Sequence, residues 1–227
     1  MKQFFVEISE MKPIEDNMYV TFEWNGEKNY LKEYGYNSRG ELATFPDAAI
    51  KYQDINGNIH IVLIEWKYTE RYQAQDKAEG DSGTTRLNTY KEFVNNSDSP
   101  LDLSILGQDI DQQMKALFYE PFYQLMREQL LAKEIENDAS NDAQIVSVLH
   151  VCPKGNVEYL SNVTSPRLQQ TYPEKNVLDI WKTLVKDSCR FLSTTPESLF
   201  QAFDVSNFDD DLKNWSAYMS ERYRINF

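Results

Sequence analysis

Residues 59–64, Ile-His-Ile-Val-Leu-Ile, form an almost unbroken apolar run. Such a run is typical of a strand that is buried on both faces, so we expect it to be central in its sheet. A second apolar stretch precedes it, and the polar sequence Asp54-Ile55-Asn56-Gly57-Asn58 separates the two. Because asparagine followed by glycine is a strong turn signal, the sequence predicts a β-hairpin over residues 44–68.

Charged side chains follow the second strand of this hairpin. Side chains alternate along a strand, so Glu65 and Lys67 should share a face with the apolar Ile61 and Leu63. A carboxylate and an ammonium group on such a face are costly to remove from water. They therefore need each other, a metal ion or a substrate phosphate.

The register of the hairpin decides whether Asp47 joins this pair. A two-residue Asn56-Gly57 turn would set Asp47 opposite Trp66, on the wrong side for Glu65. A three-residue loop that ends with a left-handed Gly57 would set Asp47 opposite Glu65. Both loops suit the residues present, so the sequence leaves both registers open.

In the second register, Asp47, Glu65 and Lys67 form a cluster that is suited to hydrolysis. Two carboxylates supply the oxygen ligands that a hard divalent cation such as Mg²⁺ or Mn²⁺ prefers. A neighbouring lysine can orient or deprotonate a water molecule for attack on a phosphodiester. The cluster therefore points to metal-dependent cleavage of nucleic acid.

The composition excludes several other classes of protein. The 227 residues include 23 Lys and Arg against 36 Asp and Glu, a net charge of −13, which argues against a bulk nucleic-acid coat. More than half of the acidic excess lies in residues 96–144, which leaves residues 67–95 nearly neutral. Two cysteines outside any metal-ligand spacing predict a reducing compartment without structural zinc. No apolar run approaches the ~18 residues of a membrane span and no secretory leader is evident, so we expect a cytoplasmic protein without a membrane partner.

The second half of the chain carries its clearest helix signal over residues 108–136, where apolar residues recur at spacings of three and four. Pro121 interrupts this pattern, which predicts a kink or a second helix that starts there. Residues 145–151 predict another buried strand. Strands joined by hairpins, together with helices, indicate a mixed α+β domain.

The flanking regions are less regular. Residues 73–100 are polar and contain glycine and proline, which predicts mostly loop around a short helix near residues 87–94. Further helices are expected over residues 176–223. We expect one domain that spans residues 1–227.

A pattern of Pro46-Asp47, seventeen intervening residues and Glu65-Trp66-Lys67 resembles the PD-(D/E)XK signature of restriction-endonuclease-like nucleases. Residues 64–70, 118–127 and 148–153 are similar to stretches of a group of uncharacterised bacterial restriction-endonuclease-like proteins. The resemblance covers most of the chain. It implies a central mixed sheet flanked by helices, with the active site at the end of the hairpin.

The resemblance also implies roles for individual residues. The metal, Mg²⁺ or Mn²⁺, would be held by Asp47, Glu65 and the backbone carbonyl of Trp66, and Lys67 would be the catalytic lysine. Many relatives add a glutamine or tyrosine from the helix after the sheet. Gln124 is the best candidate for that catalytic role here.

Other parts of the family pattern match less closely. Related folds normally begin with a helix that often carries another metal-site glutamate, and no convincing helix precedes Asp47. Either the chain starts late, as a truncated form would, or the core lacks that helix. Glu33 or Glu41 would then supply a third carboxylate to the metal. Arg86 and Arg127 are the candidates for contacts with a substrate phosphate.

Two functional hypotheses follow. The first is a metal-dependent endonuclease that acts on nucleic acid, with DNA as the preferred substrate, in restriction or phage defence; a homodimer is one arrangement compatible with it. The alternative is a catalytically silent member of the fold that serves as an interaction subunit. His60 and His150 lie within apolar strands and are expected to be core residues rather than ligands.

Overall fold

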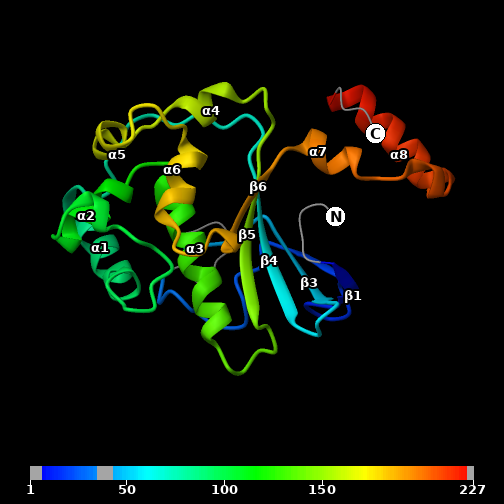
Figure 1. The fold of residues 1–227 in the computed structure, drawn as a ribbon, viewed down its shortest axis with the longest axis horizontal. Coiled ribbons are helices and arrows are strands. Elements are labelled where there is room, and N and C mark those ends of the chain that lie inside the picture. Colours follow the sequence, from blue (N-terminus) through cyan, green and yellow to red (C-terminus); the bar gives the residue numbers. More distant parts are fainter. Residues whose placement is uncertain (1–6, 35–42, 224–227) are drawn as a thin grey trace.

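The computed structural model describes residues 7–34 and 43–223, and its centre is a mixed β-sheet (Figure 1). The order of the strands is β1-β3-β4-β5-β6, and β2 pairs with β3 next to β1. β4 lies between the antiparallel β3 and the parallel β5, so its predicted central position is confirmed. The strands are β1 (Ile8–Lys12), β2 (Val20–Phe22), β3 (Ala48–Asp54), β4 (Ile59–Trp66), β5 (Ile145–Val151) and β6 (Phe191–Thr194).

Helices flank the sheet, which confirms the predicted fold class. In Figure 1, α1 to α6 gather on one side of the sheet, whereas α7 and α8 follow β6 away from that layer. No helix within residues 7–34 and 43–223 is long and apolar enough to cross a membrane. The helices are α1 (Gly80–Val94), α2 (Ile110–Leu117), α3 (Phe122–Asn137), α4 (Val157–Ser161), α5 (Pro166–Thr171), α6 (Val177–Leu184), α7 (Pro196–Gln201) and α8 (Asp210–Tyr223).

The two faces of β4 belong to different apolar clusters. Ile61 and Leu63 lie in the larger core together with side chains of α3 and α6. Val62 and Ile64 lie on the opposite face, in a smaller cluster that α7 also contacts. The predicted alternation is therefore confirmed, and it turns Glu65 toward the side of the sheet that α3 covers.

The hairpin of β3 and β4 has the register of the three-residue loop. Ala48 lies opposite Ile64, and the pairing continues without a shift to the loop. Gly57 has a φ of +88°, a conformation that residues with a Cβ rarely adopt. Asp54 stabilises the loop because its Oδ1 accepts hydrogen bonds from the backbone N–H groups of Asn56 and Asn58. The two-residue turn is therefore wrong.

The region predicted to be mostly loop contains a full helix, α1. Its glycines, which suggested loop, have structural reasons to be there. A Cβ on the buried Gly83 would lie 2.1 Å from the backbone carbonyl carbon of Ala78, so only glycine allows this close approach. The side chains of Tyr90 and Phe93 then anchor the helix in the core. Of the two alternatives at Pro121, the structure shows the second, because α3 begins immediately after it.

Candidate active site

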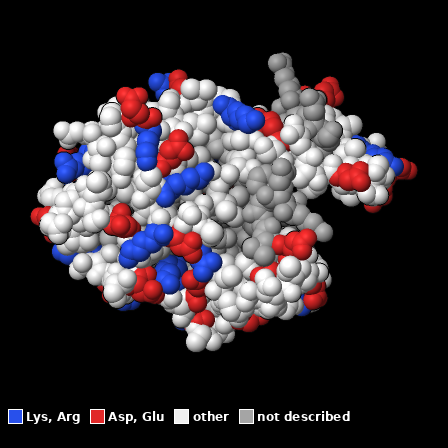
Figure 2. All heavy atoms as spheres, viewed as in Figure 1, with Lys and Arg blue, Asp and Glu red and all other residues white. Residues whose placement is uncertain are grey.

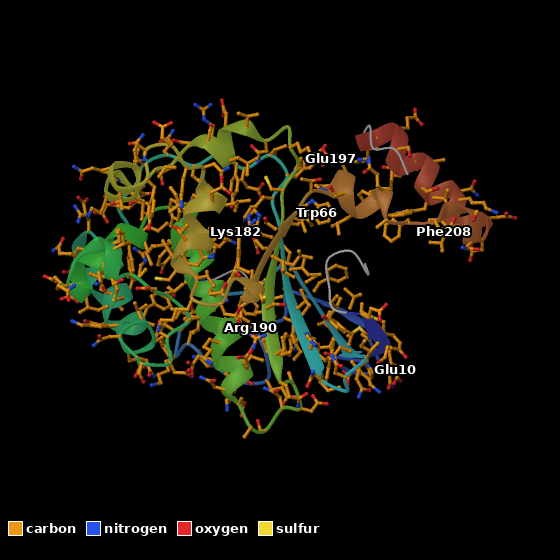
Figure 3. All side chains as sticks on the ribbon, in the orientation of Figure 1. Glu10, Trp66, Lys182, Arg190, Glu197 and Phe208 are labelled. Carbon is orange, nitrogen blue, oxygen red and sulfur yellow. The ribbon has the colours of Figure 1, made fainter. Side chains whose placement is uncertain are left out.

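The carboxyl end of β4 brings together the residues of the predicted cluster. Continuing the hairpin register by one residue sets Asp47 opposite Glu65. Asp47 is exposed, and its Oδ2 accepts a hydrogen bond of 2.7 Å from the backbone N–H of Trp66. Trp66 itself marks the last residue of β4 (Figure 3). The carboxylate of Asp47 is therefore fixed across the end of the strand that carries Glu65.

Glu65 is held by two donors on one oxygen. The Nζ of Lys67 lies 2.6 Å from Glu65 Oε1. The amide Nε2 of Gln124, in the first turns of α3, donates a hydrogen bond of 2.6 Å to the same oxygen. The Glu65 and Lys67 side chains are only 4% and 7% exposed, so this ion pair lies inside the protein. The structure thus joins Glu65, Lys67 and Gln124. Strand alternation predicted that Glu65 and Lys67 share a face, whereas only the resemblance linked Gln124 to them.

Burial and neighbouring charges set the protonation of this pair. Burial raises the pKa of Glu65, the Lys67 ammonium opposes that rise, and the Asp47 carboxylate adds to it. Burial alone would lower the pKa of Lys67, but the Glu65 carboxylate outweighs this effect and the pKa is raised overall. Lys67 is therefore a cation at neutral pH, which suits it to orient a water molecule or bind a phosphate oxygen rather than to remove a proton.

One carboxylate of the site was not predicted from the sequence. Glu128 follows Gln124 by four residues on α3, so the two side chains emerge from the same face of the helix. It is only 1% exposed, and burial together with the Glu65 carboxylate raises its pKa well above the ordinary value. The sequence signal for Glu128 was its spacing of four residues from Gln124, which places both side chains on one face of a helix.

His150 and Tyr159 form an aromatic pair close enough to Lys67 for its charge to act on His150. The hydroxyl of Tyr159 lies 2.7 Å from Nε2 of His150, and the two rings stack. His150 is fully buried, and burial lowers its pKa to about 3, so it is a neutral core histidine as predicted. His60 is also buried, 3.2 Å from a carboxylate oxygen of Asp54. Neither histidine belongs to a group of three or more His, Cys, Asp or Glu side chains that could hold a metal ion in the described part of the chain.

Glu33, predicted as a possible third metal ligand, lies in a different network. Its Oε1 accepts hydrogen bonds from the Tyr90 hydroxyl at 2.5 Å and from Nε of Arg127 at 3.2 Å. Thr44 donates to both oxygens of the same carboxylate. The structure therefore joins Glu33 to Arg127 and not to Glu65. Glu41 lies outside the described residues.

Arg86 and Arg127 line one pocket beside α1 and α3. The pocket has a volume of about 390 Å³ and also contains Lys77 and the rings of Tyr90 and Tyr123. The guanidinium group of Arg127 lies 5.3 Å from the centre of the Tyr123 ring, and Nζ of Lys77 lies 5.4 Å from it. Glu33, which pairs with Arg127, also lines this pocket, so the pocket combines cations, a carboxylate and aromatic surface.

The donors at the strand end fit a hard divalent cation in chemical type. Asp47 and Glu65 provide carboxylate oxygens, and Glu65 Oε2 is buried with no hydrogen-bond partner in the part of the chain that the structure describes. In the same part of the chain, no three His, Cys, Asp or Glu side chains converge as ligands. Asp47 and Glu65 are thus the residues that could hold the metal, and the Trp66 carbonyl stays a prediction.

Comparison with known families places this geometry in context. A family model described as "Restriction Endonuclease associating with ARP" (REase-ARP) matches residues 2–224. The chain belongs to the REase-ARP family. No curated protein and no solved structure matches it. Membership of the REase-ARP family agrees with the restriction-endonuclease-like architecture of the sheet and helices, and it indicates a nuclease that binds nucleic acid.

The surface of this REase-ARP protein does not carry one uniform charge. Figure 2 shows Lys and Arg side chains interspersed with Asp and Glu on the face that it displays. The net charge of −13 therefore does not exclude local contact with phosphates. The basic residues of the α1–α3 pocket, Lys77, Arg86 and Arg127, are the local groups that could make it.

Proposed function

We propose that the protein is a metal-dependent endonuclease that hydrolyses phosphodiester bonds of DNA through a PD-(D/E)XK site formed by Asp47, Glu65 and Lys67. The observation that supports this most directly is the convergence of Lys67 and Gln124 on one oxygen of Glu65, at the strand end that Asp47 faces. Membership of a restriction endonuclease family supports the same chemistry. A role in restriction or phage defence is part of the proposal.

Each residue of the site would have a separate task. Mg²⁺ or Mn²⁺ held by Asp47, Glu65 and the Trp66 carbonyl would polarise the scissile phosphate and acidify a water molecule. Lys67, kept protonated by Glu65, would donate hydrogen bonds that orient this water and stabilise negative charge on the phosphate. Gln124 would fix the rotamer of Glu65 through its 2.6 Å hydrogen bond.

The substrate would extend from the strand end toward the α1–α3 pocket. Arg86 and Arg127 line that pocket, and we propose that they contact DNA phosphates. Arg86 also donates from Nη1 to the backbone carbonyl of Lys77 at 3.1 Å, which holds the loop before α1 in place. Two copies that act together would allow both strands of a duplex to be cut.

Metal removal tests the proposed activity directly. Purified protein is expected to nick or linearise supercoiled plasmid in the presence of Mg²⁺ or Mn²⁺, because the carboxylates alone cannot activate water sufficiently. EDTA should abolish the cleavage, and excess Mg²⁺ should restore it. Gel electrophoresis of the plasmid measures the result. Cleavage that persists in EDTA would contradict a metal-dependent mechanism.

The affinity for metal should depend on pH. Burial and Asp47 raise the pKa of Glu65, so protons compete for this ligand at a higher pH than for an ordinary glutamate at ~4.3. Mn²⁺ affinity is therefore expected to weaken as the pH falls, and the loss should begin above the range of exposed carboxylates. Calorimetric titration with Mn²⁺ between about pH 5 and 8 measures it. An affinity that stays constant over this range would argue against Glu65 as a ligand.

The second candidate is a silent subunit that acts through a partner. The family description includes the words "associating with ARP", and the Lys67 ammonium is already neutralised by Glu65. A protein of this kind would not cleave any nucleic acid with any divalent metal, but it would still bind its partner after Asp47 is replaced by alanine. The plasmid experiment above separates the two candidates at its first step.

A further inference from the structure

Glu128 presents an unusual electrostatic problem in the interior of the protein. Its side chain is 1% exposed, and neither Oε1 nor Oε2 has a hydrogen-bond partner among the described residues. The carboxyl group of Glu65 lies within hydrogen-bonding reach of Glu128, and Glu65 Oε2 is buried as well. No N–H or O–H group of the residues that the structure describes donates to Glu65 Oε2 or to either oxygen of Glu128.

Two buried carboxylates without donors cost free energy unless positive charge compensates them. A buried ion without a partner costs several kcal/mol, so native proteins pair such groups or bind a metal. The Lys67 ammonium, whose charge acts on Glu128, already bonds Glu65 through the other oxygen, Oε1. The Nε of Arg127, next to Glu128 in the sequence, donates instead to Glu33 and Thr44.

A shared proton would solve the problem only in part. One proton between the two carboxyl groups would join one oxygen of Glu65 to one oxygen of Glu128. The second oxygen of Glu128 would still be buried without a donor from residues 7–34 and 43–223. A divalent cation can accept several carboxylate oxygens at once, in monodentate or bidentate fashion. The number of unpartnered oxygens therefore favours a metal ion.

We propose that Glu128 is a third carboxylate ligand of the cation centre, and that it binds Mg²⁺ or Mn²⁺ together with Glu65 and Asp47. This inference rests on the proposed function, because it adds a ligand to the same site. Gln124 supports it because it donates to Glu65 Oε1 from α3, which leaves Oε2 of Glu65 available for a metal ion, and Glu128 follows Gln124 by one turn on the same helix.

The three carboxylates need to draw closer for this purpose, since no three such side chains converge as ligands in the described residues. Like charges repel, and Asp47 is held toward the Trp66 N–H while Lys67 draws on Glu65. A divalent cation reverses the repulsion, and side-chain rotation on the fixed strand end and helix would bring the oxygens to it.

The test is Mn²⁺ binding to the Glu128→Gln variant, measured by calorimetry and by the loss of the free Mn²⁺ signal in electron paramagnetic resonance. Glutamine keeps the shape of glutamate and removes its charge. If Glu128 is a ligand, the variant should bind Mn²⁺ at least about tenfold more weakly than the wild type. If Glu128 only shares a proton with Glu65, the neutral variant should bind as well as the wild type, and that result would overturn the inference.

Two controls make the result specific. Glu134→Gln is the same substitution on the same helix, outside this cluster, and should leave Mn²⁺ affinity unchanged. Asp47→Asn tests the proposed metal site itself. If Glu128→Gln binds Mn²⁺ with full affinity while Asp47→Asn loses affinity, Glu128 is not a ligand, and the proposed function still stands. Mn²⁺ binding that none of these substitutions weakens would contradict both the role of Glu128 as a ligand and the proposed metal site. Thermal unfolding of each variant, without metal, checks that the fold is intact.

Discussion

Replacing Asp47 with asparagine is expected to lower the rate of DNA cleavage by about 10³-fold. Metal coordination contributes several kcal/mol of transition-state stabilisation, and each factor of ten in rate corresponds to about 1.4 kcal/mol. Asparagine keeps a side-chain oxygen that can accept the Trp66 N–H, so the strand end should keep its geometry while the negative charge is lost. Initial rates on plasmid DNA, in saturating Mg²⁺, measure the change.

The matched control for this experiment is Asp142→Asn. Asp142 is another exposed aspartate beside the sheet, and its Oδ1 pairs with Nζ of Lys51 at 2.5 Å, away from the proposed site. Its replacement should leave the rate of cleavage within about twofold of the wild type, because Asp142 lies away from the proposed site. The fold should also be kept, since surface ion pairs contribute little to stability. Equal losses in both variants, or no loss in Asp47→Asn, would contradict a metal site at Asp47.

Lys67→Met is expected to lower the free energy of unfolding by about 3–5 kcal/mol at neutral pH. Removing one partner of a buried ion pair leaves the other charge without compensation. Here the remaining Glu65 would lie beside Glu128, a second buried carboxylate. The double variant Lys67→Met/Glu65→Gln should recover most of the loss, because the new pair carries no charge. Urea unfolding curves of the single and double variants measure both effects.

A surface pair provides the comparison. Lys91→Met breaks the ion pair with Asp111, whose two side chains are 41% and 49% exposed, and should cost less than about 1 kcal/mol. The penalty for Lys67→Met should also shrink as the pH falls, since protonation of Glu65 removes the uncompensated charge. A loss in the double variant equal to the sum of the two single losses would show that Lys67 and Glu65 do not interact in solution.

The hairpin shows how far the sequence could determine the site. Periodicity located the strands and put Glu65 and Lys67 on one face, but two loops of different length fitted the same residues. The choice depends on the backbone of Gly57 and on hydrogen bonds from the loop to Asp54. The energies of this backbone conformation and of these hydrogen bonds cannot be obtained from the pattern of apolar residues. A change of one residue in register would have moved Asp47 to the other face of the sheet.

Tertiary contacts explain what the sequence did not predict. α1 contains Gly80 and Gly83, which are turn signals in isolation, yet packing of Tyr90 and Phe93 stabilises the helix. Glu128 was overlooked because a charged residue on a helix usually faces solvent, and only the crossing of α3 over the sheet buries it. Glu33 could not be assigned because its partner, Arg127, lies 94 residues away in the sequence.

Anomalous scattering from crystals soaked in Mn²⁺ tests whether Asp47 and Glu65 form a metal centre, without requiring the correct substrate. We expect a manganese peak about 2.0–2.4 Å from carboxylate oxygens of both residues, the range for hard cations bound by oxygen. Crystals without a peak at this strand end, in which Glu65 pairs only with Lys67 and Gln124, would contradict a metal centre at these residues and favour the silent interaction subunit.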